Sequence, residues 1–106
     1  ELSRIIDALN EKFKTDFNAA DELFIESVRE DAVQDQKVRS AASANDIDNF
    51  AYVFKERIDD IFVDRMEQNE EITSRFLNDA DFKDVVTTLL LKRVYDQVRE
   101  EIGVAG

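Results

Sequence analysis

The sequence contains no proline, no histidine and no cysteine, and its only glycines are Gly103 and Gly106. Because cysteine is absent, disulfides, thiolate zinc sites and cysteine nucleophiles are excluded. The absence of histidine excludes a Ser-His-Asp arrangement and any imidazole metal site. Phosphate-binding loops and dinucleotide fingerprints need glycines for close backbone approach, so these nucleotide-binding motifs are excluded as well.

The chain also lacks a long apolar run and an excess of basic residues. Its 106 residues suit one domain, 1–106, and a hydrophobic fraction of 43% with eight phenylalanines suffices for a core. With 25 acidic and 14 basic residues the net charge is -11, so we expect no direct binding of nucleic acid, which needs clustered cations. No stretch of about 18 apolar residues indicates a membrane span. We expect a soluble, cytoplasmic protein.

The N-terminal stretch "ELSRIIDALN" has neither an initiator methionine nor the pattern of a signal peptide. We therefore expect the chain to be a fragment of a larger multidomain polypeptide.

Clusters of asparagine and aspartate mark the boundaries between the predicted helices, a role that glycine and proline often have in other proteins. Their side chains can accept hydrogen bonds from the free N–H groups of a first helical turn, so they mark helix starts. The predicted caps are Asn18 with Asp21, Asn45 with Asp48, Asp35, Asn69, and either Asn78 or Asp79. The sequence thus predicts a compact all-α bundle of about six helices, 3–13, 19–34, 36–44, 46–66, 70–77 and 80–102, of which 46–66 and 80–102 are long.

Apolar residues recur at helical spacing in these segments. The clearest stripe belongs to the fourth helix, which we expect to be the central packing element: Ile47, Phe50, Phe54, Ile58, Ile61 and Phe62. The first helix has a stripe of Leu2, Ile5, Ile6, Leu9 and Phe13, and the second has Ala20, Leu23, Phe24 and Val28.

The last helix carries two apolar stripes. The first comprises Phe82, Val85, Val86 and Leu89, and the second Leu91, Val94, Tyr95, Val98 and Ile102. The nine residues from Phe82 to Leu91 correspond to about 180° of rotation, so the stripes are expected on opposite faces. One interpretation is internal packing, with the first half on the fourth helix and the second half on the first helix. The alternative is that the second stripe docks in a groove of another domain or subunit.

Paired carboxylates are the remaining candidates for chemistry. Asp46 with Asp48, and Asp79 with Asp81, approach the spacing of a calcium loop, but the glycine that makes the sharp turn of such a loop is missing. We expect capping, and no bound metal. Tyr52 and Tyr95 are interpreted as packing or interface aromatics.

Three stretches resemble the C-terminal helical region of the R subunit (HsdR) of type I restriction-modification enzymes. They are "TDFNAADELFIESVREDAVQD", "ANDIDNFAYVF" and "DRMEQNEEITSRFLNDADFKDVVTTLLLKRVYDQV". The most specific pieces are the segments 65–72, 15–21 and 91–95.

The resemblance implies a parent chain that is an ATP-dependent DNA-translocating helicase motor with an endonuclease domain, a hydrolase requiring ATP and Mg²⁺. Its catalytic motifs lie upstream, so no catalytic, cofactor-binding or metal-binding residue is expected here. The implied role is assembly: docking the R subunit to the methyltransferase (M) and specificity (S) subunits. The alternative is packing on the motor domains of the same chain. The candidate interface consists of the second stripe, namely Leu91, Val94, Tyr95, Val98 and Ile102, and of a polar surface formed by Glu67, Gln68, Glu70 and Glu71.

Overall fold

A computed structural model describes residues 3–103 of the chain. This part of the chain is all-α, as predicted. Its elements are α1 (Ser3–Phe13), α2 (Ala19–Gln34), α3 (Gln36–Ala42), α4 (Ile47–Asp64), the short 3₁₀ helix η1 (Met66–Gln68), α5 (Glu70–Asn78) and α6 (Ala80–Glu101).

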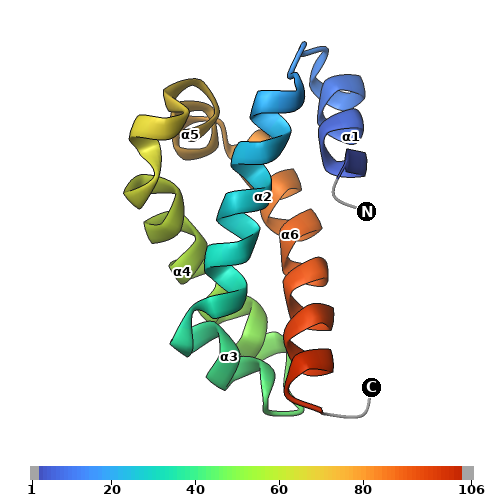
Figure 1. The fold of residues 1–106 in the computed structure, drawn as a ribbon, viewed down its shortest axis with the longest axis vertical. Helices are drawn as coiled ribbons and strands as arrows, with labels where there is room; N and C mark the ends of the chain where they lie inside the picture. The colour runs from blue at the N-terminus through green and yellow to red at the C-terminus, as the bar shows by residue number, and fades with distance from the viewer. Residues whose placement is uncertain (1–2, 104–106) are drawn as a thin grey trace.

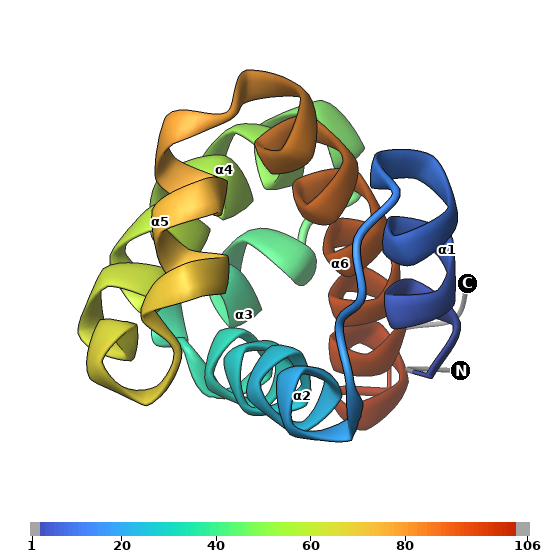
Figure 2. The ribbon, with the colours of Figure 1, turned by 90° about the horizontal axis from the view of Figure 1, so that it is seen from above.

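The helices form an elongated bundle with overall dimensions of 38 × 23 × 21 Å. The helices α2, α4 and α6 extend along the long axis, α3 lies at one end, and α1 and α5 lie at the other (Figure 1). Seen from above, α1 lies on the outer side of α6 (Figure 2). Within residues 3–103, no helix has both the length and the apolar character needed to cross a membrane.

Aromatic side chains fill much of the core. Phe62 of α4 stacks on Phe76 of α5 with ring centroids 4.0 Å apart, and Phe24 of α2 packs against the same Phe62 ring at 5.9 Å. At the start of α6, Phe82 makes edge contacts with Phe13 and Phe17. Such aromatic contacts add to the free energy gained by burying the rings.

The caps confirm most of the predicted helix starts. Asn18 and Asp21 form a reciprocal capping box at α2, and Asp35, Asn69 and Asp79 cap α3, α5 and α6. Each accepts hydrogen bonds from N–H groups that have no partner within the helix.

One predicted cap is wrong. The α4 cap is Asp46, whose carboxylate accepts from the backbone N–H of Asn49 at 3.1 Å, and not Asn45. The side-chain oxygen of Asn45 instead accepts from Arg99 at 3.0 Å. As a result α4 begins at Ile47. It ends at Asp64, two residues before the predicted end, where the N–H of Arg65 is shared by two carbonyls and the chain tightens into η1. The end of α3 likewise falls at Ala42, two residues before the predicted end.

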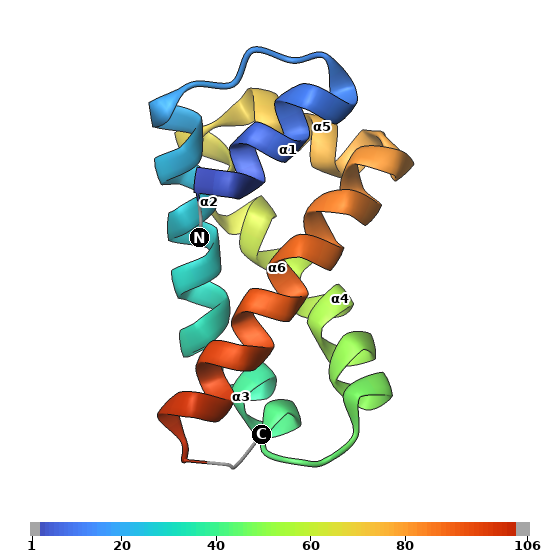
Figure 3. The same cartoon turned by 90° about the vertical axis from the view of Figure 1, so that its right-hand side faces the viewer.

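The buried face of the last helix turns gradually along its length, and its two ends bury nearly opposite sides, as the rotation of about 180° between the two stripes predicts. Its fully buried residues recur at every fourth position: Phe82, Val86, Leu90, Val94 and Val98. Each step of four residues turns by about 40°, so the buried face rotates gradually by about 160° along the helix. This rotation matches the oblique path of α6 across its neighbours (Figure 3).

Of the two predicted neighbours of α6, the fourth helix is confirmed for the first half, and the first helix is wrong for the second half. Its start contacts the end of α1 through Phe82 and the C-terminal half of α4 through Lys83, which pairs with Asp59. Its second half contacts the start of α4 and the end of α3, through Tyr95 and Arg99. The second half was expected on the first helix.

Parts of two other stripes are exposed. Ala20 and Leu23 of α2 face outward, with Leu23 67% exposed, and Ile47 of α4 is about half exposed. In α2 the buried positions are instead Phe24, Ile25, Val28, Ala32 and Val33. Leu2 lies outside the described residues.

Candidate docking surface

The side of α4 turned away from Phe50 and Phe54 carries exposed apolar residues among charged ones. This outward stripe consists of Asp48, Tyr52, Lys55, Glu56, Asp59 and Val63, which lie within about 100° of the helix circumference. Tyr52 is 66% exposed and Val63 is 49% exposed. The stripe arises because the other face of α4 packs on the core, while no helix within residues 3–103 covers this one.

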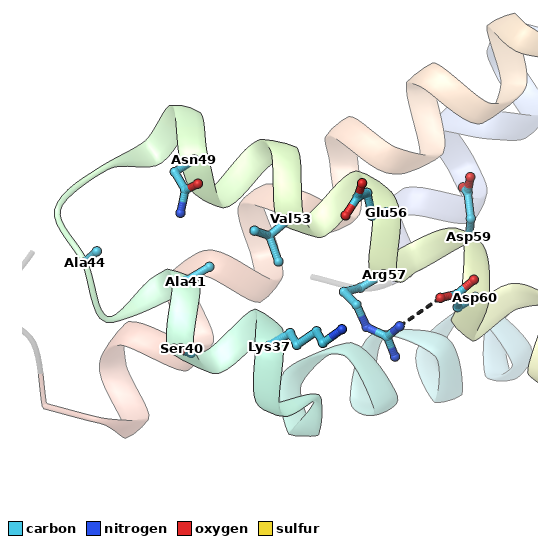
Figure 4. A pocket seen from close by; sticks show the side chains of 10 residues that line it. All are labelled: Lys37, Ser40, Ala41, Ala44, Asn49, Val53, Glu56, Arg57, Asp59 and Asp60. Carbon is cyan, nitrogen blue, oxygen red and sulfur yellow. Dashed lines mark hydrogen bonds and ion pairs between the residues drawn. The ribbon is translucent and has the colours of Figure 1, made fainter.

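An open groove runs along one side of the outward stripe, between α3 and α4 (Figure 4). Its volume is about 700 Å³, and its lining residues are Lys37, Ser40, Ala41, Ala44, Asn49, Val53, Glu56, Arg57, Asp59 and Asp60. The groove is shallow on the α3 side because the α3 side chains that line it are mostly small. One end is formed by Ala44 and Asn49, whereas Glu56, Asp59 and Asp60 give the other end its charge (Figure 4).

A second groove, of about 450 Å³, runs along the other side of the outward stripe, between α4 and α6. Its lining residues are Tyr52, Lys55, Glu56, Asp59, Ala80, Lys83, Asp84 and Thr87. Glu56 and Asp59 line both grooves. The outward stripe is therefore a ridge between two grooves, and the three features form one continuous surface.

Ion pairs fix the walls of this surface. Arg57 donates to both carboxylate oxygens of Asp35 at 2.9–3.2 Å and to Asp60 at 2.8 Å, which ties α4 to the junction of α2 and α3. Lys83 of α6 donates to Asp59 at 2.9 Å and lies 5.4 Å from the Phe76 ring centroid. Both pairs cross between elements, so they fix the spacing of the helices that border the grooves.

The Asp35–Arg57 pair also shifts the pKa values of its members. Burial alone raises the pKa of the Asp35 carboxyl, but the hydrogen bonds from Arg57 and from the backbone N–H of Val38, with the charge of Arg57, lower it below its ordinary value overall. The hydrogen bond to Asp35 raises the pKa of Arg57. Both groups are therefore held in their charged forms.

The second stripe of α6 is mostly internal. Val94 and Val98 are fully buried, Leu91 and Tyr95 are partly buried against the core, and Ile102 is 36% exposed. The Tyr95 ring lies 4.8 Å from the Phe50 ring and 5.1 Å from the Arg99 guanidinium. In this conformation a partner could touch only the edge of this stripe.

The predicted polar surface lies at the corner between α4 and α5. Glu67, Gln68, Glu70 and Glu71 are all exposed. Gln68 accepts a hydrogen bond from Arg65, which in turn pairs with Asp31 of α2. No ion pair to the three glutamates occurs within residues 3–103.

The acid pairs considered as cation ligands lie at the starts of helices. Asp46 and Asp79 are the N-caps of α4 and α6, and Asp81 lies in the first turn of α6. Among the described residues, no three potential ligands of the His, Cys, Asp and Glu types converge as a metal site would require.

Sequence reasoning did not single out the outward stripe, although a signal for it exists. Tyr52 is two residues from both Phe50 and Phe54, which places it about 160–200° from them on a helix. Once Phe50 and Phe54 are assigned to the core, Tyr52 has to face outward. The grooves could not be found this way, since they depend on how α3 and α6 lie beside α4.

No protein-family model matches the chain, and no curated protein or solved structure matches it significantly. The fold and the surface define an all-α helical domain with one ridged, partly apolar face.

Proposed function

We propose that this chain is a non-catalytic assembly domain that docks one protein to another through the outward stripe of α4. The observation that carries the proposal is the exposure of Tyr52 and Val63 on the outward stripe, which a groove borders on each side between residues 49 and 60. Exposed aromatic side chains are enriched among residues that dominate binding energy, and flanking grooves can receive the side chains of a partner.

The proposed partner follows from the sequence resemblance. If the parent chain is an R subunit of a type I restriction-modification enzyme, the domain attaches that motor and nuclease subunit to the methyltransferase core of M and S subunits. ATP and Mg²⁺ then act in the upstream parts of the parent, in the cytoplasm. The net charge of -11 favours contact with protein over contact with DNA.

Two features support a non-catalytic role for these residues. Histidine and cysteine, the most versatile catalytic side chains, are absent from the sequence. One acid of each pair, Asp46 or Asp79, is a helix cap whose side-chain oxygen accepts hydrogen bonds from backbone N–H groups.

A pull-down of the 106-residue chain with the purified methyltransferase and specificity core of its own system tests the proposal. We expect capture of the core by the natural chain, and loss of capture with Tyr52→Ala combined with Val63→Ala. The matched control is Leu23→Ala, which removes an equally exposed apolar side chain from α2. Circular dichroism should show the same helical content in all of them.

Capture that survives the double substitution would refute the outward stripe as the docking surface. Capture of the separately purified motor domains of the parent chain, with no capture of the methyltransferase core, would favour the alternative of a structural domain within the R subunit.

A further inference from the structure

The segment 65–69, which joins α4 to α5, is fixed to α2 at both of its ends. At one end Arg65 donates through Nε and Nη2 to the two carboxylate oxygens of Asp31, and the Nη2 distance is 3.0 Å. At the other end the side-chain amide of Asn69 donates to Asp21 at 2.7 Å. We propose that this segment is a strap that closes the junction of α2, α4 and α5 and that opens as one unit when either anchor is released.

The two anchor points on α2 lie on one face of that helix. Asp21 and Asp31 are separated by about 80° around the helix and by about 15 Å along its axis. Phe24 and Val28 lie on the same face between them, and both are buried. The strap is therefore attached to the acidic ends of a stripe whose centre is apolar.

The aromatic cluster at this junction has one ring from each of the three helices. Phe62, near the end of α4, packs against Phe24 of α2 and stacks on Phe76 of α5. The strap connects the helices that carry Phe62 and Phe76, and its anchors hold it to the helix that carries Phe24. Release of an anchor therefore loosens the junction without changing any of these rings.

Each end of the strap also belongs to a helix end. The backbone N–H of Arg65 donates to the last carbonyls of α4, those of Ile61 and Phe62. Asn69 is the N-cap of α5, because its side-chain oxygen accepts from the N–H of Ile72 at 3.0 Å while its amide group donates to Asp21. An open strap is thus expected to loosen the end of α4 and the start of α5 together.

The strap is held by polar contacts that water can replace. None of the residues of η1, Met66–Gln68, is buried. The side chains of Arg65 and Asp31 are 25% and 40% exposed. Partly exposed ion pairs contribute little to stability, so opening of the strap costs less free energy than unfolding of the whole domain.

This inference does not depend on the docking function, because the strap contains no residue of the outward stripe. It has a consequence for that stripe all the same. Val63 lies in the last turn of α4, just before the strap begins. A closed strap therefore keeps this end of the outward stripe in place.

Amide hydrogen exchange, measured residue by residue by NMR on the 106-residue chain, reports such local opening. The amides to follow are those that donate hydrogen bonds within the strap or at its ends, namely Arg65, Gln68, Asn69, Ile72 and Thr73. In the natural chain we expect them to share one protection factor, at least about tenfold below those of the buried Leu90 and Val94 in α6.

Two substitutions release one anchor each. Asp31→Asn removes the charge that binds Arg65, and no hydrogen bond or ion pair joins Asp31 to α5 within residues 3–103. Asn69→Asp retains an oxygen that can cap α5 but cannot donate to Asp21. The matched control is Asp96→Asn, which removes the same charge from an exposed ion pair with Lys92 on α6. Circular dichroism of each variant checks that the fold is retained, and either anchor variant alone suffices for the test.

The decisive effect is the one at the opposite end of the strap. Asp31→Asn should lower the protection of Ile72 and Thr73 by about three- to fivefold, and Asn69→Asp should do the same at Arg65. Asp96→Asn should change these values by less than about twofold.

An effect confined to the nearer end in each variant would show that the two ends open separately, and it would overturn the inference. Strap amides as strongly protected as Leu90 and Val94 would overturn it as well, since the segment would then open only when the whole domain unfolds.

Discussion

The second half of α6 and the outward stripe of α4 each carry a tyrosine, and the two side chains lie in opposite environments. Tyr95 is packed between the Phe50 ring and the Arg99 guanidinium, next to the fully buried Val94 and Val98. Tyr52 is 66% exposed between two grooves. Hydrophobic periodicity alone left open whether the first region packs inside the domain or docks on a partner. The difference shows that an extra apolar face on a helix indicates a second neighbour, which can belong to the same domain.

The strongest test of the difference between the two regions is to place charges in the second half of α6. Val94→Asp combined with Val98→Asp buries two carboxylates in the apolar core, and we expect the domain not to fold, because the cost of several kcal/mol per buried charge exceeds the stability of a small domain. Circular dichroism measures the loss of helix. The matched variant, Tyr52→Asp with Val63→Asp, should remain folded. A folded Val94/Val98 variant would show that these residues are not core.

The success of most helix-start predictions and the wrong neighbour predicted for the second half of α6 have one physical cause. Caps such as Asn18 and Asp35 act on N–H groups two or three residues away, so the sequence around them contains the whole interaction. Asn45 has the same local pattern, yet its side chain is taken by Arg99, which is 54 residues away. Which apolar face of α6 is covered likewise depends on the crossing of distant helices, which local periodicity does not encode.

Arg99 provides a second test of the comparison, because it holds the end of α6 through neutral acceptors. No ion pair of Arg99 occurs within residues 3–103. It is buried and donates to the carbonyls of Ala42 and Ala44, where α3 ends, as well as to Asn45. Arg99→Met keeps much of the side-chain volume but leaves these acceptors without their donor. We expect a loss of about 2–4 kcal/mol in the free energy of unfolding, measured by urea denaturation.

The exposed Lys92, which pairs with Asp96 one turn away, is the control for Arg99. Lys92→Met should change the free energy of unfolding by less than about 0.5 kcal/mol. Equal effects of the two substitutions would contradict the role assigned to Arg99.

The Asp35–Arg57 pair should produce a smaller, pH-dependent effect. Asp35→Asn retains a side chain that can cap α3 but removes the charge, so we expect a loss of about 1–2 kcal/mol at neutral pH. Because the pKa of Asp35 is lowered in the folded protein, its charge stabilises the fold above the unfolded pKa of about 4, and this contribution is lost as the pH falls through the folded pKa.

Urea denaturation of both proteins over an acidic pH series measures this contribution as their difference in stability. That difference should shrink as the pH falls below about 4. A difference that stays constant over this range would show that the substitution acts through shape or capping and not through charge.

The smallest expected effect is the most direct test of the comparison between the two tyrosines. Tyr52→Ala removes a side chain that contributes little to the core, so the free energy of unfolding should change by less than about 0.5 kcal/mol. Tyr95→Ala removes the ring that separates Phe50 from Arg99, and we expect a loss of about 2–3 kcal/mol. Urea denaturation of both variants gives the two values side by side. Similar losses would mean that Tyr52 also stabilises the fold, and the outward stripe would then be a structural surface instead of one free to bind a partner.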